Sequence, residues 1–338
     1  MRDVFAKLAA MVLCFAAFTF SAHAQTTPPS NVILVTIDGV RWQELFRGAD
    51  PALVTDDATR ARFVDVPDRT TALAPFILSF AQNGALVGNR DAGSCARVAN
   101  RYWFSYPGYA EILSGRPNPS VQYNAAIPNS DVTILERLAR RPDFAGQVRV
   151  FAAWDAVPAI VNAARSSIPV YTAPSAELPQ DPHVMDAVRA AFTDPPRVTW
   201  IALGDSDSYA HEGDYAGYLN AIANADAFIR ELWQNIEADP RRAGRTTLIV
   251  TTDHGRGVPS WRGHGSGRWR WTLVPGLYHP MSDETFIAAR GPGISSANYA
   301  LPNCATNGQV AATLLQSVGA SDEMQPDMAP PLVVLGAR

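Results

Sequence analysis

Short runs of apolar and β-branched residues punctuate the chain at positions 31–37, 148–152, 198–203, 247–251 and 285–289. Within each run the hydrophobicity is continuous rather than alternating. Such runs are typical of strands that are buried on both faces, as in a parallel or mostly parallel sheet. We therefore expect these segments to form a central sheet.

Apolar residues at helical spacing lie between several of these runs. The clearest helical pattern ends at Asp239 and Pro240, and its apolar positions are Tyr218, Ile222, Ala225, Ile229, Leu232 and Ile236. Segments 133–140 and 309–317 are shorter candidates, and Gly319 closes the second. Strands alternating with helices predict an α/β fold, a three-layer sandwich with a mostly parallel central sheet flanked by helices. No internal repeat or clear linker interrupts residues 25–338, so we expect one domain there.

The segment 256–283 follows neither pattern, and we expect it to be a long irregular insertion. It contains Trp261, Trp269 and Trp271. Long loops in compact domains are often functional. These rings either line a site or pack the loop against the domain.

Composition excludes several classes of protein. The 338 residues are 47% apolar and 18% charged, with a formal net charge of −4, and glycine shows no period. Intrinsic disorder and a collagen-like chain are therefore excluded. The slightly acidic balance and the lack of a long basic run also argue against binding to a nucleic-acid polymer.

The first 24 residues have the order of a secretory signal peptide. Arg2 and Lys7 precede an apolar run over 8–20, and small residues follow it, so we expect cleavage after Ala24. That run is too short to cross ~30 Å of hydrocarbon as a helix, and no later stretch is long and apolar enough. We expect a periplasmic or secreted protein with no membrane span in the mature chain.

Export would leave two cysteines, Cys95 and Cys304. In an oxidising compartment they can form one disulfide. The alternative is two separate buried thiols, and the sequence does not decide between them.

Acidic residues and histidines follow three of the predicted strands. In open α/β sheets, ligands bind beyond the carboxyl ends of the strands. The residues at these ends are Asp38 after the first run, Asp205, Asp207 and His211 after 198–203, and Asp253, His254 and His264 after 247–251. Each alone is weak evidence, since an aspartate after a strand is usually part of a turn. Together, carboxylates and imidazoles predict a metal site suited to Zn²⁺, with Mn²⁺ or Mg²⁺ less favoured.

Ser105 is the candidate nucleophile. Pro107 suits the first turn of a helix that Gly115 can end, which places Ser105 at the helix N-terminus. A serine hydroxyl is a poor nucleophile at neutral pH, and coordination by a metal ion is one way to activate it. The alternative is that Ser105 only starts the helix.

Four segments in this order resemble the alkaline phosphatase superfamily, especially its nucleotide pyrophosphatase/phosphodiesterase-like branch: 34–39, 104–115, 207–211, and 251–257 followed by 263–265. The resemblance implies an alkaline phosphatase-like fold and two metal ions, taken here as zinc. Asp207, His211 and His264 would hold one ion. The other would be held by Asp38, Asp253, His254 and the Ser105 oxygen. Asn124 resembles an asparagine that contacts a phosphoryl oxygen in related enzymes, although Asn118 lies nearby.

Other side chains are weaker candidates. Tyr106, Tyr109, Trp103 and the tryptophan-bearing loop could stack on an aromatic group, or could be ordinary packing. The arginines that could contact phosphate are Arg41, Arg116, Arg256 and Arg262. Sulfatase relatives have a cysteine or serine, proline two residues later and arginine four residues later. Here Pro107 fits that pattern, but position 109 is tyrosine.

The sequence thus predicts an exported two-zinc hydrolase of small-molecule phosphoric esters that acts through a phosphoseryl intermediate on Ser105. The motifs leave open whether a monoester or a diester is preferred, and which oligomeric state the protein adopts. Three alternatives remain: a phosphomutase, a sulfatase, and a catalytically silent protein that keeps a metal site for binding.

Overall fold

A twisted seven-stranded sheet forms the centre of the computed structural model, which describes residues 31–174, 177–258, 260–269, 272–294 and 304–332. The strand order is β2-β11-β7-β1-β6-β4-β5. The strands are β1 (Asn31–Ile37), β2 (Ala85–Val87), β4 (Val148–Ala152), β5 (Val170–Thr172), β6 (Val198–Leu203), β7 (Thr246–Thr251) and β11 (Ile287–Arg290). The five strands from β7 to β5 run parallel, whereas β11 pairs antiparallel with both β7 and β2.

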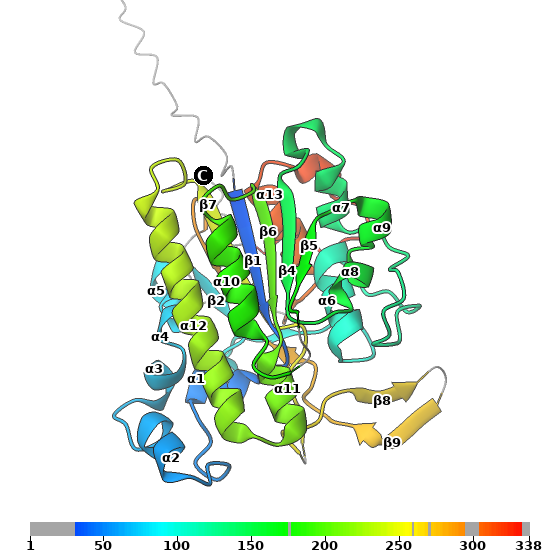
Figure 1. The fold of residues 1–338 in the computed structure, drawn as a ribbon. Coiled ribbons are helices and arrows are strands. Elements are labelled where there is room, and N and C mark those ends of the chain that lie inside the picture. Colours follow the sequence, from blue (N-terminus) through cyan, green and yellow to red (C-terminus); the bar gives the residue numbers. More distant parts are fainter. Residues whose placement is uncertain (1–30, 175–176, 259, 270–271, 295–303, 333–338) are drawn as a thin grey trace, which may run out of the picture.

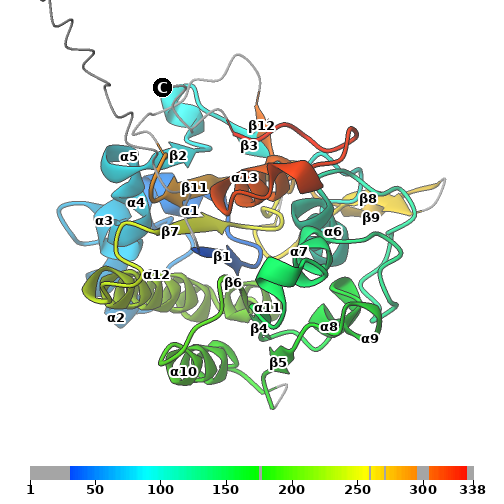
Figure 2. The same ribbon diagram turned by 90° about the horizontal axis from the view of Figure 1, so that it is seen from above.

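Helices cover both faces of this sheet (Figures 1 and 2). One face is covered by α6 (Ser105–Ser114), α7 (Ile134–Ala139), α8 (Val157–Ile160) and α13 (Gln309–Ser317), with α9 (Ala163–Ser166) beside α8. The other is covered by α1 (Trp42–Arg47), α2 (Asp57–Phe63), α3 (Arg69–Leu73), α4 (Pro75–Leu78), α5 (Phe80–Asn83), α10 (Asp181–Ala191), α11 (Asp205–Glu212) and α12 (Tyr215–Ala238). Single-turn 3₁₀ helices occupy Arg90–Ala92, Pro142–Phe144 and Ser321–Glu323.

Burial on both faces explains why β1 is apolar along its whole length. Val32 and Leu34 point into the core beneath α6 and α13, while Ile33, Val35 and Ile37 point into the core beneath α12. All five are at most 2% exposed. The predicted three-layer α/β sandwich is therefore confirmed.

Most predicted elements are present, with two corrections. The segment 285–289 is not one strand of the main sheet: it divides at Phe286 into β10 (Glu284–Thr285) and β11. The insertion 256–283 is not wholly irregular, because β8 (Ser266–Trp269) and β9 (Thr272–Tyr278) pair as an antiparallel hairpin that projects from the domain (Figure 1). Its two strands pair with each other and not with the main sheet.

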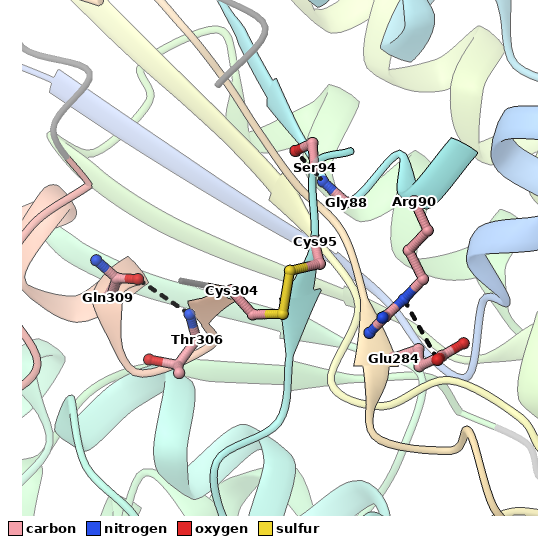
Figure 3. The surroundings of a disulfide bond; sticks show 8 residues. All are labelled: Gly88, Arg90, Ser94, Cys95, Glu284, Cys304, Thr306 and Gln309. Atoms are coloured by element: carbon pink, nitrogen blue, oxygen red, sulfur yellow. Dashed lines mark hydrogen bonds and ion pairs between the residues drawn. A yellow bond between two sulfur atoms is a disulfide. The ribbon is translucent and has the colours of Figure 1, made fainter. Parts of the chain in front are cut away.

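The two cysteines pair across a second, three-stranded sheet, formed by β10, β3 (Ala96–Arg97) and β12 (Ala305–Thr306). Cys95 immediately precedes β3 and Cys304 immediately precedes β12, and their sulfur atoms are 2.07 Å apart (Figure 3). The Ala305 amide donates to the Cys95 carbonyl at 2.9 Å. The structure thus decides for the disulfide over two separate thiols.

The predicted signal peptide, residues 1–24, lies outside the described residues. Within the described ranges, no helix is both long and apolar enough to cross a membrane.

Candidate metal centre

The predicted ligands converge at the carboxyl ends of three adjacent strands. Strand β1 lies between β6 and β7 in the sheet, so the residues that follow these strands meet at one edge. Helix α11, which begins two residues after β6, and the hairpin β8–β9 lie at this end of the sheet (Figure 1). The side chains that meet there are Ser105, Asp38, Asp207, His211, Asp253, His254 and His264.

Three oxygen atoms surround one nitrogen of His254. Its Nε2 is 3.3 Å from Asp38 Oδ1, 3.4 Å from Asp253 Oδ2 and 3.3 Å from Ser105 Oγ. The other ring nitrogen, Nδ1, is 2.8 Å from the Gly255 carbonyl oxygen and so carries the proton that it donates. In the neutral form of His254, that tautomer leaves a lone pair on Nε2, the atom that faces the oxygens.

This arrangement is not a serine–histidine–aspartate triad. In a triad, the carboxylate contacts the imidazole nitrogen opposite the one that faces the serine. Here both carboxylates face the same nitrogen as Ser105, and a backbone carbonyl takes the opposite one. The ligand atoms of Asp38, Asp253 and His254 lie within 4.8 Å of one another, which is close enough for them to share one cation.

The charge of this group also fits a cation. Asp38 and Asp253 are buried, and Asp38 Oδ1 and Asp253 Oδ2 have no hydrogen-bond partner. Burial and the neighbouring Asp38 carboxylate raise the pKa of Asp253 well above its ordinary value. Although burial acts in the opposite direction, Asp253 and Asp38 raise the pKa of His254 to about 9. Two buried carboxylates that share the single imidazole of His254 are costly, so a divalent cation among these atoms would stabilise them.

A second group of ligands lies beside the first. His211 Nε2 is 3.0 Å from His264 Nε2 and 3.1 Å from Asp207 Oδ2. His264 Nε2 is 3.7 Å from Asp207 Oδ1, and its ring centroid is 4.0 Å from that of His254. The His211 side chain is 51% exposed, so this group opens to solvent. The ligand atoms of Asp207 and His264 also lie within 4.8 Å of one on His254, so His254 borders both groups.

Arg256 is a buried cation within the second group. Its guanidinium forms an ion pair with Asp207 Oδ1, donates through Nε to the Trp261 carbonyl at 2.8 Å, and donates to the Arg262 carbonyl. Burial alone would raise the pKa of Asp207, but Arg256 and His264 hold it well below its ordinary value. Arg256 thus fixes a predicted ligand together with the loop that leads into His264.

Gly39 makes room for this contact. Its φ of +63° lies in the left-handed region, and a Cβ there would be 2.5 Å from Asp207 Oδ1. The Gly39 amide also donates to Asp253 Oδ1 at 3.1 Å, so the turn after β1 contacts ligands of both groups.

A strained turn presents the candidate nucleophile. Trp103 has a φ of +61°, which for a bulky residue costs about 1–3 kcal/mol. The Asn100 side-chain oxygen holds this turn by accepting the amides of Tyr102 and Trp103, at 2.9 and 3.2 Å. Buried Glu111 on α6 in turn accepts from the Asn100 amide and side chain. Helix α6 therefore anchors the turn that leads into its own first residue, Ser105.

Two further residues of α6 bring the helix to the ligands. A Cβ at Gly108 would lie 2.5 Å from the Asp253 carbonyl oxygen, so only glycine allows this approach. Tyr109, which is 2% exposed, donates its hydroxyl to Asp38 Oδ2 at 2.8 Å. That bond leaves Asp38 Oδ1 turned toward His254.

Asn124 lies beside the start of α6. Its Oδ1 accepts the Tyr106 amide at 3.0 Å, and within the described part of the chain its Nδ2 has no partner. The other candidate, Asn118, donates to Asp131 at 2.7 Å and accepts from the Ser120 amide. Asn124 is therefore the one placed to donate to a bound phosphoryl group.

The remaining candidates divide between the core and the surface. Tyr106 is fully buried and Tyr109 nearly so, which identifies both as packing residues rather than stacking surfaces for a ligand. Arg41 pairs with Glu44 at 3.2 Å, and Arg116 pairs with Asp131 and Asp327, at 2.7 and 2.9 Å. Arg262 is exposed. Of the four arginines considered, only Arg256 touches a predicted ligand. Asp205, also noted after β6, instead accepts backbone amides at the start of α10.

The sequence did not identify the roles of Glu111, Tyr109 and Asn100. Each of these residues acts through one or a few hydrogen bonds to other parts of the site. The sequence offered one clue to these roles: Glu111 and Tyr109 are polar side chains in a mostly apolar helix, and Asn100 is a polar residue shortly before Ser105.

Part of the chain matches a known family. Residues 160–266 match the family model of the metalloenzyme superfamily. That segment contains Asp207, His211, Asp253, His254 and His264. No curated protein matches the chain.

Several solved structures share the fold. A phosphonate monoester hydrolase of Agrobacterium radiobacter is 13% identical, with a TM-score of 0.56 over 87% of this chain and 74% of that one. Murine ectonucleotide pyrophosphatase/phosphodiesterase 5, an inactive form in complex with AMP, is 14% identical, with a TM-score of 0.53 over 86% of this chain and 95% of that one. A protein in the alkaline phosphatase superfamily from Vibrio parahaemolyticus is 11% identical, with a TM-score of 0.51 over 87% and 67%.

Sulfatases are also among the structures with this fold, at similarly low identity. At these identities the similarity establishes the fold but does not identify the substrate. The resemblance carried by the motifs is confirmed: residues 160–266 match the metalloenzyme superfamily, and the chain has the fold of alkaline phosphatase superfamily structures.

Proposed function

We propose that this protein is an exported, two-zinc hydrolase of small phosphoric esters with Ser105 as its nucleophile. The observation that carries the proposal is the convergence of Ser105 Oγ, Asp38 Oδ1 and Asp253 Oδ2 on His254 Nε2, beside a second group of Asp207, His211 and His264. Two carboxylates and imidazoles favour zinc over magnesium, which prefers an all-oxygen set of ligands.

When bound, the two metal ions would lower the pKa of the serine hydroxyl and neutralise charge on the phosphoryl oxygens. Ser105 Oγ attacks phosphorus, so that a P–Oγ bond forms while the bond to the leaving oxygen breaks, and that oxygen takes up a proton. Asn124 Nδ2 donates to a phosphoryl oxygen. Water then attacks phosphorus, the P–Oγ bond breaks, and Ser105 is restored with release of phosphate, or of a monoester from a diester.

Position 109 favours a phosphoric ester over a sulfate ester. The sulfatase pattern requires arginine four residues after the residue that is converted to formylglycine. Here that position is Tyr109, whose hydroxyl is committed to Asp38 at 2.8 Å. A phosphomutase is less consistent with export, because its sugar phosphate substrates are cytoplasmic. A catalytically silent binding protein would not need Ser105 held in a strained turn.

Export is supported by the order of residues 1–24 and by the Cys95–Cys304 disulfide, since such bonds persist in oxidising compartments.

The test compares 4-nitrophenyl phosphate, bis(4-nitrophenyl) phosphate and 4-nitrophenyl sulfate on zinc-loaded protein before and after chelation. We expect chelator-sensitive hydrolysis of a phosphate ester and none of the sulfate. Ser105→Ala should abolish hydrolysis yet retain two zinc ions per chain. Full activity in that variant would refute the mechanism, and hydrolysis of the sulfate alone would identify a sulfatase.

A further inference from the structure

A small cavity opens directly beside the candidate centre. Its volume is about 250 Å³, and Tyr102, Phe104, Asn124, His264 and Arg268 line it together with the backbone of 265–267. Phe104 immediately precedes Ser105, and His264 is a predicted ligand. The cavity is therefore close enough to receive the organic substituent of a phosphoryl group held at Ser105.

Apart from Asn124, His264 and Arg268, the walls of the cavity offer carbon rather than hydrogen-bonding groups. The rings of Tyr102 and Phe104 lie 5.9 Å apart at 47°. The Tyr102 hydroxyl donates to the Pro119 carbonyl at 2.8 Å, and the Ser266 hydroxyl donates to the Arg101 carbonyl. These polar atoms are already paired within the protein and are not available to a ligand.

The wall is also held in place before any ligand binds. The Ser266 amide donates to the Tyr102 carbonyl at 3.0 Å, and the His279 amide donates to the Gly265 carbonyl at 2.8 Å. The start of the hairpin β8–β9 is thereby bonded to the turn that precedes Ser105, and its end is bonded to the residue after His264. A cavity formed in advance costs little ordering on binding.

Size and polarity restrict the ligand. Pockets for drug-sized ligands are typically about 300–1,000 Å³, so this cavity suits a single ring. A sugar ring would lose hydrogen bonds to water that these walls do not replace. A flat apolar ring loses nothing comparable and gains contact with both aromatic side chains.

One charge stands at the edge of the cavity. Arg268 is exposed, and among the residues that the structure describes its guanidinium has no ion-pair partner. A free guanidinium matches a carboxylate in geometry and charge.

We propose that this cavity is the site for the organic group of the ester, and that it selects a compact aromatic ring with an anionic substituent facing Arg268. The proposal rests on the proposed function, because the phosphoryl group must occupy the adjacent centre.

The test measures binding by calorimetry to zinc-loaded protein, with three non-hydrolysable ligands: methylphosphonate, phenylphosphonate and 4-carboxyphenylphosphonate. Burial of the ring should make phenylphosphonate bind about tenfold tighter than methylphosphonate, or more. The carboxylate should add a further severalfold gain. Equal affinity for methyl- and phenylphosphonate would overturn the proposal while leaving the proposed centre intact, whereas failure of all three to bind would overturn both.

Two variants assign the effect to residues. Phe104→Ala should reduce the advantage of phenyl over methyl, whereas Tyr278→Ala, an exposed hairpin aromatic outside the cavity lining, should preserve it. Arg268→Ala should remove the gain from the carboxylate, and Arg262→Ala, another exposed arginine, should retain it. Loss of that gain in both arginine variants would indicate general electrostatic attraction and would refute the role of Arg268.

Discussion

Replacing Arg256 by lysine tests how one metal site is held together. The arginine side chain is fully buried and reaches three acceptors: Asp207 Oδ1, the Trp261 carbonyl and the Arg262 carbonyl. Lysine keeps the positive charge but has a single nitrogen and no planar fork, so it cannot reproduce this arrangement. Arg256→Lys therefore removes orientation while retaining charge.

The expected loss of zinc affinity follows from the residues that these hydrogen bonds orient. Asp207 is a predicted ligand, and the segment 260–263 held by the two carbonyl contacts leads directly into His264, another ligand. Loss of partners that orient metal ligands typically weakens metal affinity by about 10–100-fold, which corresponds to about 1.4–2.8 kcal/mol. We expect this loss for the Asp207, His211 and His264 group alone.

The assay is zinc titration against a chromophoric chelator, with bound zinc counted by mass spectrometry. Wild type should retain two ions at a chelator concentration that leaves Arg256→Lys with one. Arg262→Lys is the matched control, because Arg262 is exposed and contributes only its carbonyl to this network. Equal zinc retention in all three proteins would show that the hydrogen bonds of Arg256 do not orient the metal ligands.

Three further perturbations test other parts of the structure. Tyr109→Phe removes the hydrogen bond to Asp38 and should weaken zinc binding about 10-fold or more. Tyr106→Phe, a control on the same helix, loses only a bond to the Ile127 carbonyl in the loop after α6 and should not weaken zinc binding; equal losses would contradict the role of Tyr109. Burial raises the pKa of Asp226 to about 6, so the folded state holds its proton more tightly and stability falls as the pH rises from about 4 to 6. We expect the free energy of unfolding of wild type minus that of Asp226→Asn, measured with denaturant, to be about 2 kcal/mol more positive at pH 4.5 than at pH 7.5. A difference that does not change with pH would refute this. Replacing Cys95 and Cys304 by serine opens a loop with a sequence separation of 209 and should lower the free energy of unfolding by about 3–5 kcal/mol; unchanged stability would refute that contribution.

The sheet could be predicted from sequence because its central strands are buried on both faces. Strands β1, β6 and β7 read as continuous apolar runs, and such runs arise in few other settings in a soluble α/β domain. The clustering of the predicted ligands could be anticipated for a related reason, because residues that follow neighbouring parallel strands meet at one edge of the sheet.

The hairpin β8–β9 could not be predicted in the same way. Strand β9 contains Pro275 and Gly276, both of which are disfavoured in strands, and the two strands pair with each other rather than within the main sheet. The division was missed because Phe286 is itself apolar and buried, so the run from Thr285 to Ala289 shows no break in the sequence. Only tertiary pairing places β10 with β3 and β11 with β7.

The residues that orient the site depend on contacts between distant parts of the chain. Arg256 is 49 residues from Asp207, and Tyr109 is 71 residues from Asp38. Arginine after a strand and tyrosine in a helix are both common, so local pattern gives neither a role. Their roles can be assigned only once the fold has placed Asp207 beside Arg256 and Asp38 beside Tyr109.

The two ligand groups differ in how their charge is balanced, and this difference gives the Arg256 experiment its internal reference. Asp38 and Asp253 each present an oxygen that has no hydrogen bond and faces only His254, whereas one oxygen of Asp207 is already paired with a guanidinium. No contact of Arg256 reaches Asp38 or Asp253 directly in the described structure. A change confined to the Asp207 group therefore reports the geometry that Arg256 imposes, whereas weakening of both groups would mean that the whole edge of the sheet had been disturbed.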